Sequence, residues 1–196
     1  AASIGDGYEG SNELVEAYAN SETDFHQTVA DLAGIERKQA KTIGLGLMYG
    51  MGKNKLGMSL GLSTEEASAL ISKYNRKVPF VKLLSDRCMK KANDEGVIRT
   101  KKGRKCRFEN YYRPAFTYKA LNRLIQGSAA DQTKQAIVSC YEAGYLPKVQ
   151  IHDELCFDIA SENDIKNIKE TMETCMEFKV PSKVDVALGD DFGQAS

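Results

Sequence analysis

The sequence predicts an α+β fold, with a largely helical first half and a second half that combines helices with a small antiparallel sheet. Capping pairs that mark helix starts recur along the chain. Short segments of alternating hydrophobicity, which are typical of strands, begin only at residue 97. The 196 residues are 42% hydrophobic and 28% charged, a composition that allows a packed core.

The helices are predicted from start and stop signals. Glycines and prolines supply the stops, because glycine accepts the left-handed conformation and proline cannot continue a helix. The starts pair a capping residue with an acid or amide three positions later: Asp24 with Gln27, Ser63 with Glu66, Ser128 with Asp131 and Ser161 with Asp164. The expected helices run from Asp24 to about Gly34, over 36–49, from Ser63 to before Pro79, over 80–95, over 116–143, and from Ser161 to before Pro181.

The strands are few and fall into three groups. Segments 97–100 and 104–108 flank Lys102-Gly103 and predict a hairpin. Segments 148–152 and 154–159 flank an acidic pair, and 183–188 alternates hydrophobic with other residues. The last two groups lie on either side of one expected helix, and helix 116–143 could cover the same sheet.

Composition limits the class of protein. No run of about 18 apolar residues is present, so no membrane span is expected. The five cysteines are scattered and include no CxxC pair, which favours a reducing cytoplasm over a disulfide frame or zinc site. We therefore expect a cytoplasmic protein.

An acidic pair interrupts one predicted strand segment. In "QIHDELCFDI", residues 150–159, Asp153 and Glu154 sit among alternating hydrophobic residues. Burying an unpaired carboxylate costs several kcal/mol, roughly. We therefore expect a cation, a hydrogen-bond network or a tight turn at this point.

A second stretch, "RKQAKTIGLGLMYG" at 37–50, places Arg37, Lys41, Leu45 and Tyr49 at intervals of four. Each step of four drifts only about 40° around a helix, so the four share one face. Arg and Lys could hold phosphates, while the other two could meet a sugar or base. An ordinary amphipathic helix with snorkelling cations is the alternative.

Two further features accompany this stripe. Gly44 and Gly46 each lower helix stability by about 1 kcal/mol relative to Ala, so we expect the close approach of another chain or a ligand. His26, just upstream in "DFHQ", is structural when considered alone.

The net charge is zero, but one segment is strongly basic. Residues 99–107, "RTKKGRKCR", carry six basic side chains and no acid. This hairpin could bind a polyanion, with a solvated surface as the alternative. Its candidate contacts with such a polyanion are Lys101, Lys102, Arg104 and Lys105.

The acidic pair and the stripe are consistent with one chemistry. Mg²⁺ is usually held by one or two carboxylates together with substrate phosphates. Asp153, at a hairpin tip, could hold the metal, and Arg37 with Lys41 could hold the far end of a triphosphate. Two metal ions on the attacking and leaving oxygens would make a nucleotidyl transferase.

These motifs resemble the C-terminal part of family A DNA polymerases, especially phage members. "RKQAKTIGLGLMYG" resembles the family's motif B, Arg-x3-Lys-x3-aromatic-Gly-x2-Tyr-Gly, and "IHDE" resembles motif C with its catalytic aspartate. "QGSAAD", 126–131, and "DFHQ" are similar to two further family segments. Their order and spacing agree from about Glu13 to Phe192.

The resemblance implies roles for individual residues in a template-directed DNA polymerase that uses dNTPs, primer-template DNA and Mg²⁺. Asp153 binds catalytic metal beside Glu154, and His152 lies near the primer terminus. The remaining implied contacts are His26, Arg37, Lys41 and Leu45 with the nucleotide, Tyr49 and Gly50 with the templating base, and Asn122 and Gln126 with the minor groove.

The chain departs from the family pattern at several places. Leu45 stands where the family usually has Phe or Tyr, and Tyr118 where many members have Arg. The family's motif A, which carries the other metal-binding aspartate, is not found. We therefore expect residues 1–21 to follow a missing motif A, with fingers over 22–115 and the C-terminal palm over 116–196, and an upstream polymerase half as partner.

Two other hypotheses remain open. One is a catalytically silent DNA- or nucleotide-binding module, or one subunit of a split polymerase. The other is a generic α+β domain whose motifs coincide by chance. The reading frame upstream of Ala1 would separate a fragment of a whole polymerase from the first of these.

Overall fold

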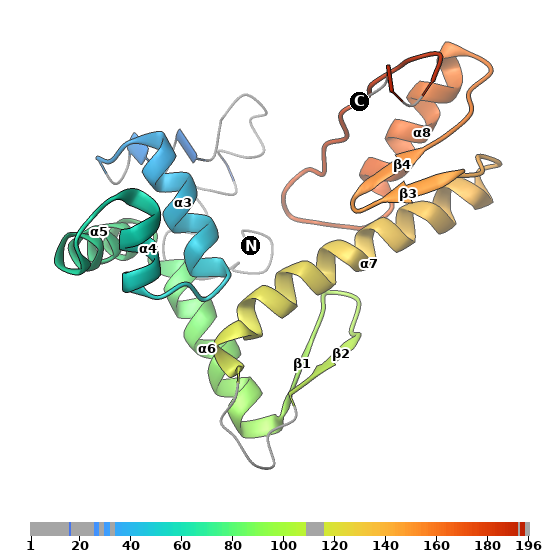
Figure 1. Cartoon of the computed structure of the whole chain (residues 1–196). Coiled ribbons are helices and arrows are strands. Elements are labelled where there is room, and N and C mark those ends of the chain that lie inside the picture. The colour runs from blue at the N-terminus through green and yellow to red at the C-terminus, as the bar shows by residue number, and fades with distance from the viewer. Residues whose placement is uncertain are drawn as a thin grey trace. The chain divides into compact units, whose positions relative to one another are not determined.

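The computed structural model describes residues 16, 26–27, 30–31, 34–108, 116–191 and 193–194 (Figure 1). The chain forms two compact units, 1–128 and 129–196. Apart from Glu16, the expected N-terminal segment 1–21 lies outside the described residues, as does Asp24. His26, Gln27, Ala30 and Asp31 are helical, consistent with the helix expected there.

Between residues 37 and 95 the first unit contains four helices: α3 (Arg37–Met48), α4 (Lys53–Leu60), α5 (Thr64–Lys77) and α6 (Pro79–Glu95). Ser63 and Glu66 form the predicted capping box of α5, and hydrogen bonds from Ser63 lower the pKa of Glu66. Gly96 ends α6 in the left-handed conformation, as expected. Helix α4 was not predicted, because its N-cap is Gly52, which carries no side chain that signals a helix start.

The core of this unit explains why these helices fold together. Ile43 of α3, Leu56 of α4, Tyr74 of α5 and Phe80 of α6 are each at most 1% exposed and belong to one hydrophobic cluster. Leu121, from the start of α7, joins the same cluster. Packing of four helices through these side chains therefore fixes the exposed face of α3.

A basic hairpin follows α6. Strands β1 (Val97–Arg99) and β2 (Lys105–Arg107) pair antiparallel, with Ile98 opposite Cys106. Gly103 has a φ of 84°, and its N–H donates to Thr100, closing the turn. The predicted hairpin is confirmed.

Helix α7 (Ala120–Glu142) follows a short 3-10 helix, η1 (Thr117–Lys119). The two units divide within α7, after Ser128. The expected helix start at Ser128 is wrong: Ser128 lies inside α7, and its hydroxyl donates to the Leu124 carbonyl 2.8 Å away. A serine inside a helix can donate its hydroxyl to the carbonyl four residues earlier, and it then caps no new helix.

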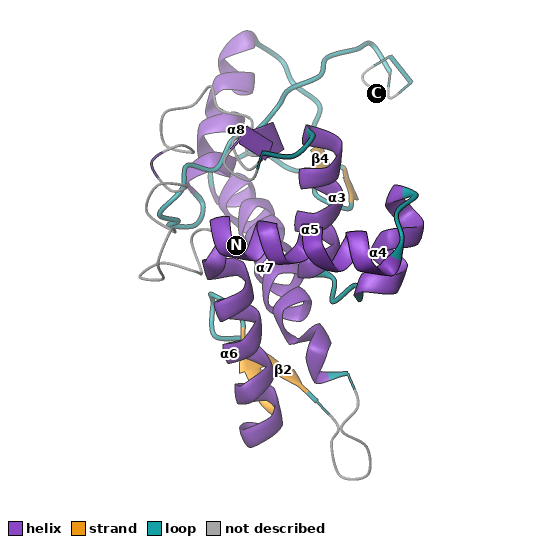
Figure 2. Ribbon diagram, turned by 90° about the vertical axis from the view of Figure 1, so that its left-hand side faces the viewer, coloured by secondary structure: helices purple, strands orange, loops and turns teal. Residues whose placement is uncertain are grey.

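The second unit contains a hairpin and one further helix. Strands β3 (Val149–Ile151) and β4 (Glu154–Cys156) pair antiparallel, and α8 (Glu162–Thr174) starts with the predicted capping box of Ser161 and Asp164. Helix α8 ends at Thr174, well before Pro181. Among the described residues the strands form two short hairpins beside the helices (Figure 2), so the fold is α+β as predicted.

The strand expected over 183–188 is wrong, because the structure assigns these residues to no strand. The backbone N–H of Val184 instead donates to the Glu173 carboxylate of α8, at 2.9 Å. Val186 and Leu188 are 45% and 61% exposed, so the alternation buries neither side chain. Within the described parts of the chain, no helix is long and apolar enough to cross a membrane.

The cysteines are free thiols. Cys88 of α6 and Cys140 of α7 are buried, and burial raises the pKa of each thiol. They therefore behave as small apolar side chains rather than as nucleophiles.

Candidate nucleotide- and nucleic-acid-binding site

The predicted stripe on α3 is exposed along its whole length. Arg37 and Lys41 are exposed, and Leu45 and Tyr49 are 37% and 49% exposed. The opposite side of the helix is buried through Ala40, Ile43, Gly44 and Gly46. The cations are thus not part of a core face, and a charged ligand has access to the stripe.

The structure explains the two glycines of α3 differently from the sequence prediction. A Cβ at Gly44 would lie 3.3 Å from the Tyr74 hydroxyl, and one at Gly46 would lie 3.2 Å from the sulfur of Met51. The close approach is therefore made by side chains of the same unit, and the expectation of another chain or a ligand at these glycines is wrong. Gly44 lets α3 sit close to α5, Gly46 makes room for Met51 and Leu56, and this packing supports the stripe from behind.

The end of α3 is held by residues from the start of α7. Gln126 donates from its side-chain amide to the Tyr49 hydroxyl at 3.0 Å. Gly50 has a φ of 73°, and a Cβ there would lie 2.7 Å from the Tyr118 ring. Three of the residues that the resemblance placed near the template and primer, Tyr49, Gly50 and Gln126, are therefore brought together at the end of α3.

The basic hairpin docks on α7 at the next two residues of "QGSAAD". Arg104 donates from its guanidinium to the Gly127 carbonyl at 2.7 Å, and the Lys101 backbone N–H donates to the Ser128 hydroxyl at 3.0 Å. A Cβ at Gly127 would lie 2.9 Å from Thr100. Gly127 and Ser128 are thus positioning residues for the hairpin, a role that sequence reasoning missed although their small size was a signal.

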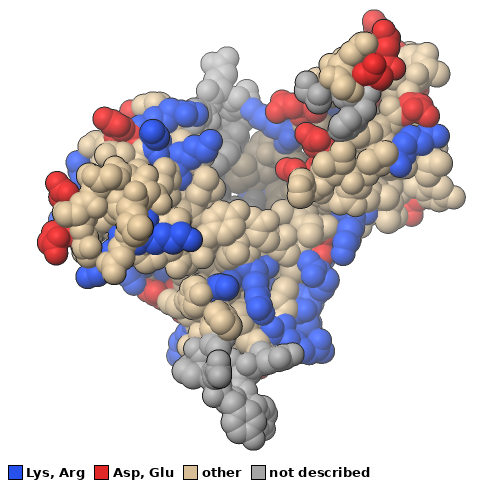
Figure 3. Space-filling model, in the orientation of Figure 1, with Lys and Arg blue, Asp and Glu red and all other residues tan. Residues whose placement is uncertain are grey.

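All six basic side chains of the hairpin are exposed, namely Arg99, Lys101, Lys102, Arg104, Lys105 and Arg107. Figure 3 shows Lys and Arg gathered over this part of the first unit. The Arg104 contact with Gly127 orients one cation, and Arg99 donates to the Gly103 carbonyl at 3.0 Å. This arrangement presents several positive charges on one short, braced element, which suits a polyanion.

The acidic pair lies at the tip of the β3–β4 hairpin. Ile151 pairs with Glu154, so His152 and Asp153 form a two-residue turn. His152 has a φ of 54°, as primed hairpin turns require, and its carbonyl accepts from the Gln150 amide at 3.0 Å. His152, Asp153 and Glu154 are all exposed. The tight turn therefore keeps these carboxylates in water rather than in the core.

The donor set at this tip fits part of a Mg²⁺ site. Asp153 and Glu154 offer carboxylate oxygens, the ligand type that Mg²⁺ prefers, and both face water. Within the described residues, no group of three or more His, Cys, Asp or Glu is placed to hold a metal ion. The tip would therefore hold a metal together with oxygens from substrate, water or other carboxylates.

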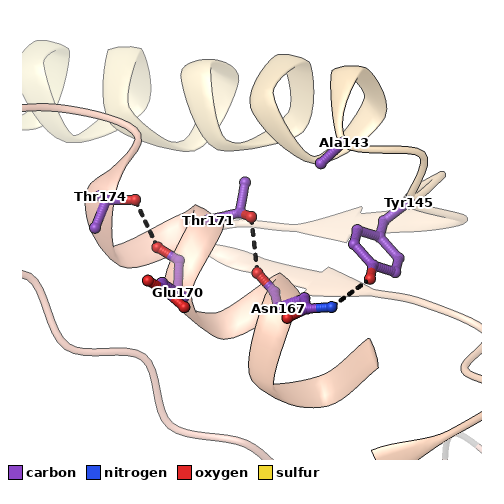
Figure 4. A pocket seen from close by; sticks show the side chains of 6 residues that line it. All are labelled: Ala143, Tyr145, Asn167, Glu170, Thr171 and Thr174. Atoms are coloured by element: carbon purple, nitrogen blue, oxygen red, sulfur yellow. Dashed lines mark hydrogen bonds between the residues drawn. The ribbon is translucent and has the colours of Figure 1, made fainter. Parts of the chain in front are cut away.

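The other predicted site residues are less informative. His26 and Asn122 are half-buried on helices. Ala143 and Tyr145, just after the C-terminal end of α7, and one face of α8 line a shallow depression of about 390 Å³ (Figure 4). Asn167 donates there to the Tyr145 hydroxyl at 2.9 Å, and Thr171 donates to the Asn167 carbonyl at 2.7 Å. None of the predicted site residues lines this depression.

The comparisons with known proteins identify the class. Residues 8–194 match the DNA polymerase family A, and the chain belongs to this family. Family A DNA polymerases use divalent metal ions, which agrees with the oxygen donors at the β3–β4 tip.

Individual relatives support the same assignment. A DNA-directed DNA polymerase of Pseudomonas phage M6 is 40% identical over 88% of this chain and 32% of its own length. The thermostable DNA polymerase I of Thermus aquaticus is 32% identical over 80% of the chain and 20% of its own length. The chain therefore spans about a third or less of these curated relatives.

A solved structure shares the fold. The POL domain of Pol1 from M. smegmatis, in complex with DNA primer-template and dNTP, matches with a TM-score of 0.75 and 29% identity. The match covers 86% of this chain and 34% of that one.

Proposed function

We propose that the chain provides the nucleotide-binding helix and one wall of the metal site of a DNA-directed DNA polymerase. The observation that carries the proposal is the exposed stripe of α3. Its last residue, Tyr49, accepts a hydrogen bond from the side-chain amide of Gln126. Family membership and the M. smegmatis structure with primer-template and dNTP support this assignment.

In this proposal α3 receives the incoming dNTP. Arg37 offers a planar fork and Lys41 a point charge to the phosphates, and both are exposed. Leu45 packs against the sugar without stacking or donating a hydrogen bond. Tyr49, the last residue of the stripe, lies near the templating base. His26 contributes a further phosphate contact.

DNA would be held by residues of α7 and the basic hairpin. Gln126 and Asn122 face the minor groove, where acceptors on all base pairs allow contact without strong sequence preference. Lys101, Lys102, Arg104 and Lys105 would neutralise backbone phosphates. The partners are therefore dNTPs and primer-template DNA.

The β3–β4 tip would hold catalytic Mg²⁺ through Asp153, with Glu154 beside it and His152 near the primer terminus. The metal would stabilise charge on the transferring phosphoryl group when bound. We propose that further carboxylate ligands come from outside the described residues, from an upstream polymerase segment. The fingers and palm boundaries at residues 115 and 116 belong to this proposal.

Primer extension by the intact protein tests the proposal. Asp153→Asn removes the charge while keeping the size, so we expect extension with Mg²⁺ to fall by about 10³-fold or more, because several kcal/mol of transition-state stabilisation are lost. Asp158→Asn is the matched control, since Asp158 lies on the same segment and forms an exposed ion pair with Lys148, at 3.3 Å.

The outcomes separate the two leading hypotheses. Equal extension by both variants would remove Asp153 from the metal site. DNA binding by the intact protein without any extension would favour the catalytically silent binding module.

A further inference from the structure

Arg123, on the first part of α7, holds the end of the basic hairpin that lies farthest from its turn. Its guanidinium donates to the Arg107 carbonyl at 2.8 Å. The same group lies over the Phe108 ring, with its Cζ 4.6 Å from the ring centroid. Phe108 is 6% exposed and belongs to the hydrophobic cluster of the first unit. These two contacts of Arg123, called here the Arg123 clasp, join α7 to the end of β2 and to the core.

The Arg123 clasp lies at the base of the hairpin. Val97 and Arg107 form the outermost pair of the two strands there. The Phe108 N–H donates to the Gly96 carbonyl at 2.8 Å, which ties the base to the end of α6. A hairpin of two three-residue strands is marginally stable by itself, so its contacts with α7 decide how far it can move.

Helix α7 therefore holds the hairpin at both ends. Gly127 accepts from Arg104 at 2.7 Å near the turn, and Arg123, four residues earlier on α7, holds the base. Residues four apart share a helix face, so both contacts lie along one face of α7. Asn122 and Gln126 each precede one of these residues by a single position, which places them about 100° away around the helix. The hairpin and the proposed minor-groove residues therefore occupy adjoining faces of α7.

The charge of the hairpin gives the Arg123 clasp a physical purpose. Residues 99–107 carry six cations, which repel one another. If the hairpin were loosely held, it would have to be ordered when a polyanion binds, and this ordering lowers affinity. A guanidinium suits the clasp, because it is planar and carries several donors, whereas the ammonium of Lys is a point charge.

We propose that Arg123 is a positioning residue for DNA binding, which fixes the basic hairpin on α7 in register with Asn122 and Gln126. The phosphates of primer-template DNA would meet the hairpin cations while the minor groove meets the adjoining face of α7. This inference rests on the proposed function, in which the hairpin contacts the DNA backbone. It adds the residue that sets the position of the hairpin relative to the minor-groove residues.

A double-mutant cycle tests this role, because residues that act through one another have non-additive effects. Arg123→Lys in the intact protein keeps the charge and loses the planar fork. It should bind primer-template DNA about 2- to 10-fold more weakly, the range for one net hydrogen bond. The slope of log affinity against log salt is then measured with and without replacement of Lys101, Lys102 and Lys105 by Gln. This triple replacement should flatten the slope by about 0.9 for each lost contact in the wild type, and by less than about half as much in Arg123→Lys.

Matched variants and a structural measurement sharpen the result. Arg76→Lys makes the same replacement at an exposed arginine of α5 and should change neither the affinity nor the effect of the triple replacement. Arg123→Met removes the charge but keeps an apolar stem beside Phe108, and it should diminish the effect of the triple replacement as Arg123→Lys does. Hydrogen exchange at the Thr100 and Phe108 amides, which are both hydrogen-bonded, should quicken in Arg123→Lys and stay unchanged in Arg76→Lys.

Two outcomes would overturn the Arg123 clasp alone. If the triple replacement flattens the slope equally in the wild type and in Arg123→Lys, the hairpin keeps its phosphate contacts and does not need the clasp. If Arg123→Lys binds as tightly as the wild type and Arg123→Met flattens the slope by about 0.9, Arg123 is itself a phosphate contact.

Other outcomes concern the proposed function. A triple replacement that leaves the slope of the wild type unchanged would overturn both the DNA contacts of the hairpin and the positioning role of Arg123. Equal primer extension by Asp153→Asn and its control would count against the proposed metal site and not against the Arg123 clasp, which is measured by DNA binding.

Discussion

The stripe of α3 and the tip of the β3–β4 hairpin are positioned in two different ways. Behind α3, Ile43, Leu56 and Tyr74 are 0–1% exposed, so a helical core holds the stripe. Along the hairpin, Val149 and the following Ile159 are 49% and 41% exposed. The stripe therefore depends on packing, whereas the carboxylates of the tip depend on a turn and two short strands.

This difference bears on how the stripe and the hairpin tip each keep their geometry. In the second unit, the buried hydrophobic residues among those described are Ala136, Cys140 and Ile168, all from helices. A two-stranded hairpin alone is marginally stable in water. The direction of the Asp153 side chain is thus less constrained by its own unit than the direction of Lys41.

The prediction with the largest expected effect compares a side chain that packs behind the stripe with one on the β3–β4 hairpin. Ile43→Ala removes a fully buried side chain from behind the stripe and should lower the free energy of unfolding by about 2–5 kcal/mol. Val149→Ala, at the half-exposed hairpin, should change it by about 0.5 kcal/mol or less. Denaturant unfolding of the intact protein measures both.

Similar losses for Ile43→Ala and Val149→Ala would contradict the comparison. They would mean that the hairpin is packed in the intact protein by residues beyond those described. Hydrogen exchange at the Leu155 and Cys156 amides would locate such packing directly.

Much of this architecture could be predicted from local signals. The capping boxes of α5 and α8, the glycine at the end of α6 and both hairpins follow from chemistry within a few residues, and all are confirmed. The exposed stripe was also predictable, because a spacing of four fixes one helix face.

The errors arose where distant residues decide the structure. Ser128 looks like a helix cap, but α7 continues through it and its hydroxyl accepts from the Lys101 backbone. The alternation at 183–188 looks like a strand, but no described strand pairs with it. The Val184 N–H instead donates a hydrogen bond to the Glu173 carboxylate. Gly44 and Gly46 of α3 leave room for the side chains of Tyr74 and Met51. The spacing of residues within the helix cannot reveal these contacts.

A second prediction tests the function of the stripe. Lys41→Ala should weaken the use of dNTP more than the binding of DNA, because a charge-assisted contact to phosphate is worth about 1.5–3 kcal/mol. Lys55→Ala is the control, since Lys55 is exposed on the neighbouring helix α4. Steady-state kinetics with varied dNTP and a separate DNA titration distinguish the two effects.

An unchanged rate for Lys41→Ala at every dNTP concentration would remove Lys41 from the site. Equal losses for Lys41→Ala and Lys55→Ala would indicate a general effect of surface charge. Only a selective loss at Lys41 supports the stripe as the phosphate-binding face.

The smallest effect per residue is expected at the basic hairpin, which α7 braces but which faces water. Replacing Lys101, Lys102 and Lys105 by Gln should reduce the slope of log affinity for duplex DNA against log salt by about 0.9 for each lost phosphate contact. The matched control replaces Lys90 and Lys91, exposed or half-exposed on α6, by Gln, and should leave the slope unchanged. Because Arg104 is retained, its bond to the Gly127 carbonyl still holds the hairpin on α7, so a flatter slope would report lost phosphate contacts rather than lost docking. If the slope stays constant in both variants, the hairpin is a solvated surface, and DNA affinity must come from α7 and the stripe.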